Sequence, residues 1–330
     1  MSRVTIKDIA EKAGVSKTIV SQYLNNNYKF MGEDTRKRIE AIVKETNYIP
    51  KSSARNLKFK KITVIHIIVA NVSSAFSNEV IKYINRIIGS STVQVIVSSF
   101  DDNPQRECDL IEQAISLDVD GIILFPSGKS VDHYQMLQDK KIPVVYVDRI
   151  PFTLDNYYCV LLNNKQAIDF SIEALVNRGH QEIAYVGLPV HKEITPRYER
   201  VAAFEEKIKD YRNVASIIIE GDEKQLGKSI AAILNKKEQG PTAFIASNDT
   251  CLEILLREYK KSSPKHKLDI VSIDGYEIYT YIEEIIMTIE HPIEDICEQI
   301  ILGLGLADKP VENEGKQLFR FSPRLFPPQD

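Results

Sequence analysis

The sequence predicts a small all-α helix-turn-helix head followed by a two-lobed, doubly wound α/β body. Two short amphipathic helices joined at a glycine open the chain, and short apolar runs alternate with helical-period segments from residue 62 onward. Residues 1–61 hold 14 Lys and Arg against 6 Asp and Glu, whereas the remaining residues hold 28 against 40. A basic head on an acidic body is typical of a nucleic-acid-binding module joined to a neutral-ligand or protein-binding domain, although a merely solvated basic face has the same charge.

The helices of the head are predicted from local capping signals. Thr5 precedes the segment IKDIAEKA and Asp8 follows three residues later, which is the pattern of a capping box. Gly14 can take the left-handed conformation that ends this helix, and Ser16 can cap the next one. A third helix is expected from about residue 33 to 45. Three short helices around a tight glycine turn form a helix-turn-helix head.

The second helix of the head has an outer face of short polar side chains. Val20 is expected to point inward, which leaves Lys17, Thr18, Ser21 and Gln22 outside. An ordinary helical hairpin would carry a mixture of Glu and Lys on such a solvated face. Hydrogen-bonding side chains on a basic head predict instead a helix that enters the DNA major groove.

The head resembles the N-terminal signature of the lactose-repressor (LacI/GalR) family, in the segments TIKDIAEKAGVSKTIVSQYLN and TRKRIEAIVKETNYIPKSSARNLK. The resemblance implies that Lys17, Thr18 and Gln22 read bases. Most members carry Arg where this chain has Gln22; Arg favours guanine, whereas Gln suits adenine. Further DNA contacts implied by the resemblance are Thr5, Ser16, Ser21, Asn25 and Tyr48.

Residues 48–61 read as a polar, basic linker whose few apolar residues have no role, or as a hinge with a function. The family resemblance favours the hinge: it implies a short helix that forms on DNA, pairs across a dimer axis and inserts Leu57 into the minor groove. Ala54 and Arg55 flank this wedge. The implied partners are a second copy of the chain and a pseudo-palindromic double-stranded operator.

The body alternates short apolar runs with segments of helical period, as parallel sheets covered on both faces do. The predicted strands are 62–69, 93–99, 121–125, 142–148, 183–188, 215–220, 242–247 and 269–274. Some 270 residues are too many for one comfortable sheet, so two similar lobes are expected. Ligands in such folds bind beyond the carboxyl ends of the strands.

The predicted strand ends are rich in Asn, Asp, Ser and Arg, with one aromatic residue among them. Each could simply cap a helix, but their recurrence predicts a polar cleft suited to a sugar. Segments such as VDGIIL, IPVVYVDR and RGHQEIAYVG extend the resemblance to the type I periplasmic-binding-protein fold of the same family. It implies effector contacts at Ser74, Phe76, Asp101, Arg149, Arg200, Asn248 and Asp274.

The predicted cleft departs from the family pattern in its charge. Asn163 stands where a carboxylate is usual, and Arg197 adds a cation near Arg200. The segments ANVSSAFS, SQYLN and TPRYER also resemble the subgroup that represses ketodeoxygluconate (KDG) catabolism. We therefore expect a sugar or sugar-acid effector and a repressor of carbohydrate catabolism genes.

The expected boundaries are a DNA-binding domain at 1–47, a hinge at 48–61 and a sensor at 62–330. Within the sensor, we expect lobe one to comprise about 62–161 and 291–321, and lobe two about 162–290 and 322–330. MSRVTIKDIAEK is charged and does not resemble a signal peptide, and four Cys without CxxC spacing suit a reducing compartment, so we expect a bacterial cytoplasmic protein.

Enzymatic function is not expected, because the chain has no GxxxxGK[ST], GxGxxG, GxSxG or HExxH motif. The six His have no metal-ligand spacing, so no metal and no cofactor are predicted. Two alternatives stay open: a catabolite-control-type regulator whose co-repressor is a phosphoprotein, and a cytoplasmic sugar-binding protein without a role on DNA.

Overall fold

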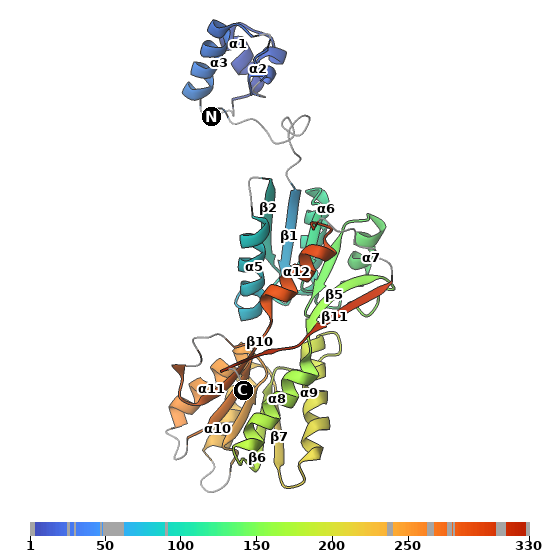
Figure 1. Cartoon of the computed structure of the whole chain (residues 1–330), viewed down its shortest axis with the longest axis vertical. Coiled ribbons are helices and arrows are strands. Elements are labelled where there is room, and N and C mark those ends of the chain that lie inside the picture. The colour runs from blue at the N-terminus through green and yellow to red at the C-terminus, as the bar shows by residue number, and fades with distance from the viewer. Residues whose placement is uncertain are drawn as a thin grey trace. The chain divides into compact units, whose positions relative to one another are not determined.

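The computed structural model describes residues 4–24, 27–29, 31–46, 48, 63–89, 92–235, 240–262, 267–275, 279, 281–307 and 315–327. The chain divides into two compact units, Met1–Thr63 and Val64–Asp330 (Figure 1). The predicted DNA contacts Asn25, Ala54, Arg55 and Leu57 lie outside the described residues.

The first unit contains helices α1 (Ile6–Ala13), α2 (Lys17–Leu24) and α3 (Glu33–Glu45). Thr5 and Asp8 form the predicted capping box at the start of α1, and Gly14 ends the helix with φ 61°. The helices enclose a small core of Ile9, Ala10, Ala13, Val20 and Ile39. The prediction of a helix-turn-helix head is therefore confirmed.

The second unit contains two sheets of mostly parallel strands, and each is the core of one lobe. The first sheet has the order β11-β5-β4-β3-β1-β2. Its strands are β1 (Thr63–Val69), β2 (Val93–Ser99), β3 (Gly121–Leu124), β4 (Val144–Val147), β5 (Tyr157–Leu162) and β11 (Lys316–Phe321). Its helices are α5 (Ala75–Ile88), α6 (Pro104–Ser116), α7 (Val131–Asp139) and α12 (Ile293–Gly303).

The second sheet has the order β12-β10-β9-β8-β6-β7, with β12 antiparallel to β10. Its strands are β6 (Glu182–Gly187), β7 (Ala215–Glu220), β8 (Ala243–Ala246), β9 (Asp269–Ile273), β10 (Ile285–Glu290) and β12 (Arg324–Phe326). Its helices are α8 (Asn164–Asn177), α9 (Thr195–Lys207), α10 (Glu223–Leu234) and α11 (Asp249–Ser262), and η1 (Ile208–Asp210) is a 3₁₀ turn. The two-lobed, doubly wound fold is as predicted.

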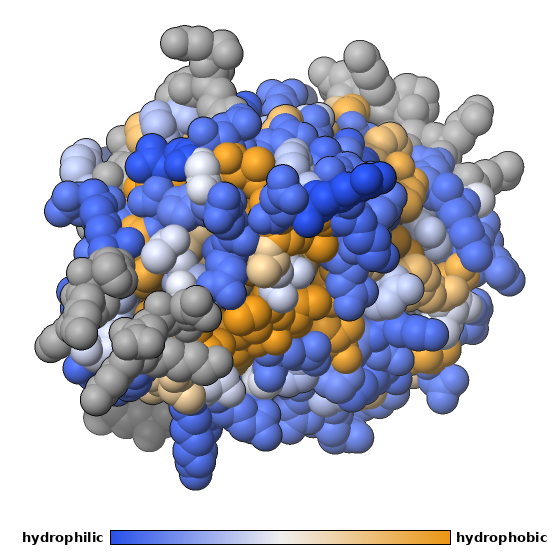
Figure 2. All heavy atoms as spheres, turned by 90° about the horizontal axis from the view of Figure 1, so that it is seen from below, coloured by the Kyte–Doolittle hydropathy of each residue, from blue (hydrophilic) through white to orange (hydrophobic). Residues whose placement is uncertain are grey.

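The chain passes between the lobes after β5, after β10 and after β11 (Figure 1). Three short connections therefore join the lobes, and we call them the interlobe hinge to distinguish them from the predicted hinge at residues 48–61. In the described part of the chain no helix is long and apolar enough to cross a membrane. The face drawn in Figure 2 is largely hydrophilic, with an apolar region near its centre.

Candidate functional site

The outer face of α2 presents the polar side chains that the sequence predicts. Lys17 and Thr18 are exposed, Ser21 and Gln22 are half-buried, and Val20 points into the core. The hydroxyl of Ser16 accepts a hydrogen bond from the amide of Ile19 at 3.3 Å, which satisfies one free donor at the start of the helix. This face can therefore offer both donors and acceptors to base edges.

Two other predicted DNA contacts have structural roles in the head. The backbone amide and hydroxyl of Thr5 donate to Asp8 Oδ2 at 2.7 Å and 2.8 Å. These hydrogen bonds, the one from the amide first, lower the pKa of Asp8. Tyr48 is half-buried against the core of the head. Both residues hold the shape of the head, whatever they contact beyond it.

A cavity of about 170 Å³ lies between the two lobes, at the carboxyl ends of their strands. The two sheets face each other there, as the doubly wound fold predicts. The cavity is lined by all of the predicted effector contacts except Asp101, namely Ser74, Phe76, Arg149, Arg197, Arg200, Asn248 and Asp274. Their distant positions in the sequence therefore converge on one site.

Arg200 is the central cation of this cleft. Its side chain is almost fully buried and donates through Nη1 and Nη2 to the two carboxylate oxygens of Asp274, at 3.0 and 3.1 Å. Nε donates to Asn164 Oδ1 at 2.8 Å, and Nη1 donates to the carbonyl of Ser247. Burial alone would raise the pKa of Asp274, but Arg200 and His291 outweigh it and hold the pKa well below its usual range.

His291 is a residue of this site that the sequence did not indicate. Its Nε2 lies 2.8 Å from Asp274 Oδ1, and its ring stacks on Phe76 with centroids 3.7 Å apart. Phe76 belongs to α5 of the first lobe, whereas His291 lies on the connection between β10 and α12. The sequence carries no signal for this contact, because it depends on how the connection packs against α5.

Asp101 is the one predicted effector contact that does not line the cavity, whereas its neighbour Asp102 does. Asp101 is exposed, hydrogen-bonds the Ser99 hydroxyl and pairs with Arg106 at 2.5 Å, outside the cavity. Asp102 lines the cavity, and its Oδ1 lies 3.4 Å from Arg149 Nη2. The strand-end rule found the correct loop, but both residues have positive φ, so the turn decides which side chain faces the cleft.

Ser74 and Asn248 combine a place in the cleft with helix capping. The hydroxyl of Ser74 accepts from the amide of Ser77 at 3.4 Å, and Asn248 Oδ1 accepts from the amide of Cys251 at 2.9 Å. Asn163, expected to alter the charge of the cleft, caps α8 and is not among the residues that line the cavity. The capping interpretation therefore holds for all three, and the first two also face the cleft.

Arg197 differs from the other arginines of the cleft. Its Nη1 donates to the carbonyl of Pro189 at 3.4 Å, and it forms no ion pair with any residue in the described ranges. Burial first, and then the nearby charge of Arg149, lower the pKa of Arg197. Among the described residues, its positive charge therefore has a backbone carbonyl as a partner but no carboxylate.

Three further carboxylates, Asp148, Glu223 and Asp249, line the cleft and were not predicted. Asp148 has φ 68°, and burial raises its pKa. Asp249 Oδ2 accepts a hydrogen bond from the amide of Ala75 at 2.8 Å, which joins the second lobe to the first turn of α5. The amide of Ile150 donates across the lobes to the Thr195 hydroxyl at 2.9 Å. Both hydrogen bonds require the lobes to be closed.

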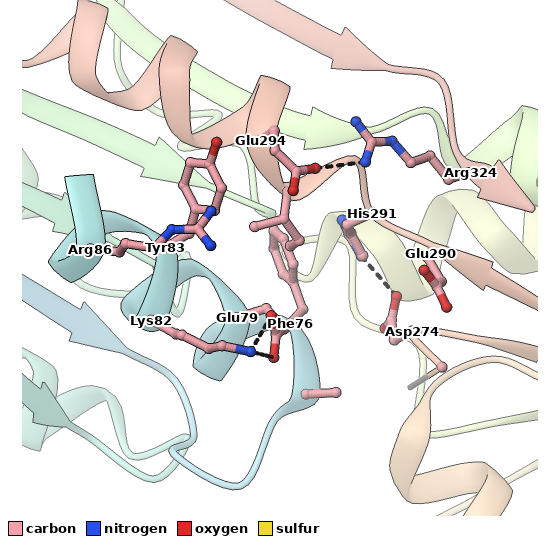
Figure 3. Close-up of a pocket in the computed structure, with 13 residues that line it drawn as sticks. Phe76, Glu79, Lys82, Tyr83, Arg86, Asp274, Glu290, His291, Glu294 and Arg324 are labelled. Atoms are coloured by element: carbon pink, nitrogen blue, oxygen red, sulfur yellow. Dashed lines mark hydrogen bonds and ion pairs between the residues drawn. The ribbon is translucent and has the colours of Figure 1, made fainter. Parts of the chain in front are cut away.

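A second, larger cavity of about 550 Å³ lies beside the interlobe hinge (Figure 3). Phe76 and Asp274 line both this cavity and the cleft, so they form a shared wall. Most of its charges are already paired, as Figure 3 shows for Glu79 with Lys82 and for Glu294 with Arg324.

Comparison with known proteins identifies the family. The profile "Bacterial regulatory proteins, lacI family" matches residues 5–51, and the profile "Periplasmic binding protein domain" matches residues 65–282. A protein of Paenibacillus polymyxa named "Probable HTH-type transcriptional regulator EndR" is 33% identical over 293 residues, covering 87% of this chain and 86% of the relative. The chain belongs to the lacI family of bacterial regulatory proteins.

Other relatives of this lacI-family chain agree. The "HTH-type transcriptional regulator KdgR" of Bacillus subtilis (strain 168) is 28% identical and covers 96% of this chain and 97% of its own length. A solved structure of "the Lac Repressor bound to ONPG in repressed state" superposes with a TM-score of 0.73 over 98% of both chains, at 20% identity. The fold and the resemblance predicted from the sequence are confirmed, and the relatives are regulators of transcription, not enzymes.

Proposed function

We propose that this lacI-family regulator is a sequence-specific repressor whose operator binding is controlled by a small sugar or sugar acid bound between the lobes. The observation that carries the proposal is the cleft: polar groups from both lobes, with Arg200 and Asp274 at its centre, surround a cavity of about 170 Å³. Pockets for drug-sized ligands measure roughly 300–1,000 Å³, so this one favours a ligand of about one sugar ring.

The proposed division of labour follows the chain. Residues 1–47 bind DNA, 48–61 form the hinge, and 62–330 form the sensor, whose lobes comprise about 62–161 with 291–321 and 162–290 with 322–330. Two copies bind one pseudo-palindromic operator, with α2 of each copy in the major groove. A ligand that prefers one arrangement of the lobes shifts the fraction of protein that can bind the operator.

The proposal is tested in two independent steps. A selection from randomised duplexes should yield one pseudo-palindrome that the protein binds with a Kd of about 10⁻⁸–10⁻¹¹ M, against roughly 10⁻⁴–10⁻⁶ M for unrelated DNA. If the selection enriches no duplex, the proposed role on DNA is wrong. A thermal-shift screen of sugars and sugar acids should then give a compound that changes operator affinity; no such compound would remove the effector.

A variant separates reading of bases from the fold of the head. Gln22→Ala should lose discrimination between operators while the helix-turn-helix head stays folded, because Gln22 is outside the core of the head. An unchanged preferred site would show that Gln22 does not contact bases.

A further inference from the structure

A third cavity, of about 210 Å³, lies at the mouth of the cleft and was not predicted. Arg149 and Arg197 line both cavities, so the two are neighbours that share these guanidinium groups. The charged and titratable residues of this mouth cavity come from both lobes, and they are Asp102, Lys129, Arg149, His191, Glu193 and Arg197.

The two cavities differ in the sign of their charge. The cleft has five carboxylates against three guanidinium groups: Asp102, Asp148, Glu223, Asp249 and Asp274 against Arg149, Arg197 and Arg200. The mouth cavity has three permanent cations, Lys129, Arg149 and Arg197, against the two carboxylates of Asp102 and Glu193. An anionic group on a ligand is therefore more stable at the mouth than in the cleft.

Two of the cations at the mouth are available to a ligand. Arg149 is held by Asp102 and by the carbonyl of Pro126. In contrast, neither Lys129 nor Arg197 forms an ion pair within the described ranges. Lys129 belongs to the first lobe and Arg197 to α9 of the second. An anion between them would bridge the lobes.

The loop that carries Lys129 is held in place by a buried carboxylate. Glu107 is fully buried and accepts hydrogen bonds from the Ser127 amide at 3.0 Å, the Ser130 hydroxyl at 2.6 Å and the Tyr134 hydroxyl at 2.8 Å. Ser127 and Ser130 flank Lys129 on both sides. The backbone of this loop is therefore fixed before a ligand arrives, which lowers the entropy that binding must overcome.

We propose that the mouth cavity is an anion subsite that holds a carboxylate or phosphate of the effector between Lys129 and Arg197, while the hydroxyl groups of the effector lie in the cleft. This rests on the proposed function and narrows the effector to an acidic or phosphorylated sugar. Because the two cations lie on opposite lobes, the anion stabilises the closed arrangement.

Calorimetry on the full-length protein tests the subsite without DNA. The probes are D-glucose, D-gluconate, D-glucose 6-phosphate and inorganic phosphate, followed by each acid found in the screen together with its neutral parent sugar. Anionic compounds should bind and their neutral parents should bind at least about tenfold more weakly, because a charged hydrogen bond is worth about 1.5–3 kcal/mol. Comparing carboxylates with phosphates identifies which anion the subsite takes.

Three variants locate the anion. Lys129→Gln and Arg197→Gln should each weaken binding of an anionic ligand about 10- to 100-fold and leave binding of the neutral parent unchanged. Lys140→Gln removes an exposed lysine of the same lobe that lies outside the mouth cavity, and it should change nothing. Unchanged melting temperatures would show that all three variants fold.

The anion subsite would be refuted if a neutral parent sugar bound as tightly as its acid. It would also be refuted if anion binding were unchanged in both Lys129→Gln and Arg197→Gln. The third refuting result is that neither phosphate nor any other anionic compound binds. If the operator selection fails but anions still bind, the proposed role on DNA is wrong and the subsite stands, because the subsite is measured without DNA.

Discussion

Gly128→Ala should prevent the lobes from closing fully. Gly128 lies in the loop between β3 and α7 with φ 77°, and it faces Glu193 of the second lobe. A Cβ atom at this position would lie 2.6 Å from the Cβ of Glu193 and 3.2 Å from its carbonyl oxygen. Ordinary contacts of a Cβ begin at 3.4 Å, so the lobes would have to separate by about 0.8 Å.

The size of the effect follows from the cost of overpacking. Inserting a methyl group into a filled contact costs about 1–3 kcal/mol, and here that cost falls on the closed arrangement alone. The backbone strain of Ala at positive φ, about 1–2 kcal/mol, is present in both arrangements and leaves the equilibrium between them unchanged. Since 1.4 kcal/mol corresponds to a factor of ten, the equilibrium constant for closure of the lobes should fall about 5- to 150-fold.

Amide hydrogen exchange measures closure directly. The amides of Ala75 and Ile150 donate across the lobes, to Asp249 and Thr195, so they exchange when the lobes part. In Gly128→Ala the exchange rates of these two amides should rise about 5- to 150-fold, the same factor by which closure is weakened. Amides in the centre of β3 and β8, which lie within single lobes, should keep their wild-type rates relative to global stability.

Gly315→Ala is the matched control, because Gly315 also has φ 77° and a Cβ there would meet nothing within 4 Å. It should lose a similar amount of global stability and leave Ala75 and Ile150 unaffected. Equal exchange rates of these two amides in both glycine variants would refute the proposed contact between Gly128 and Glu193.

Three other substitutions test the cleft and the head. Asp274→Asn should destabilise the sensor by about 3–5 kcal/mol in denaturant titrations, because it leaves Arg200 buried without its partner, whereas the exposed Asp295→Asn should cost far less. Since the pKa of Asp274 is lowered, wild type should keep this contribution at neutral pH and lose it only in strong acid, and Asp274→Asn should remove that acid dependence. Gln22→Arg should shift one operator position from A·T towards G·C by about 1–3 kcal/mol of discrimination, measured by selection from randomised duplexes. Thr5→Ala should destabilise the head by about 0.5–2 kcal/mol, followed by circular dichroism, through loss of the α1 cap.

Local rules predicted the head well because its structure is set by neighbours in the sequence. The capping box of Thr5 and Asp8 spans three residues, and the turn at Gly14 needs only one backbone conformation. The eight predicted strands of the body correspond to observed strands for the same reason, since each contains a short run rich in apolar residues. Where structure depends on adjacent residues, sequence patterns are sufficient.

The strands β5, β10, β11 and β12 were not predicted. The three connections of the interlobe hinge follow β5, β10 and β11. β11 is an edge strand whose residues alternate between exposed and half-buried, so it lacks an apolar run. β12 has only three residues. Edge strands such as β11 and β12 are defined by the neighbour with which they pair, which a single sequence does not state. In contrast, β5 and β10 are interior strands with buried apolar runs, which the sequence pattern could have indicated.

The cleft shows the same limit at the level of side chains. The sequence indicated that Arg149, Arg197 and Arg200 lie near one another, and the cavity contains all three. It did not indicate that Asp102 and Asp274 already pair with Arg149 and Arg200, which leaves only Arg197 uncompensated. Each pair joins residues of a single lobe that are far apart in the sequence, so it depends on packing within that lobe, which the sequence pattern does not state.

Phe76 and Asp274 form a wall between the cleft and the cavity of about 550 Å³, and this wall connects the proposed ligand site to the interlobe hinge. Asp274 binds Arg200 on one side and His291 on the other, and His291 stacks on Phe76 in the first turn of α5. His291 also lies on one of the three connections between the lobes, so the proposed effector would act on the interlobe hinge if it exchanged hydrogen bonds with Asp274. Allosteric coupling typically needs about 1–3 kcal/mol, and one hydrogen bond to a charged group supplies about 1.5–3 kcal/mol. Under the proposed function, a single hydrogen bond made in only one arrangement of the lobes would therefore be enough to couple the cleft to DNA binding.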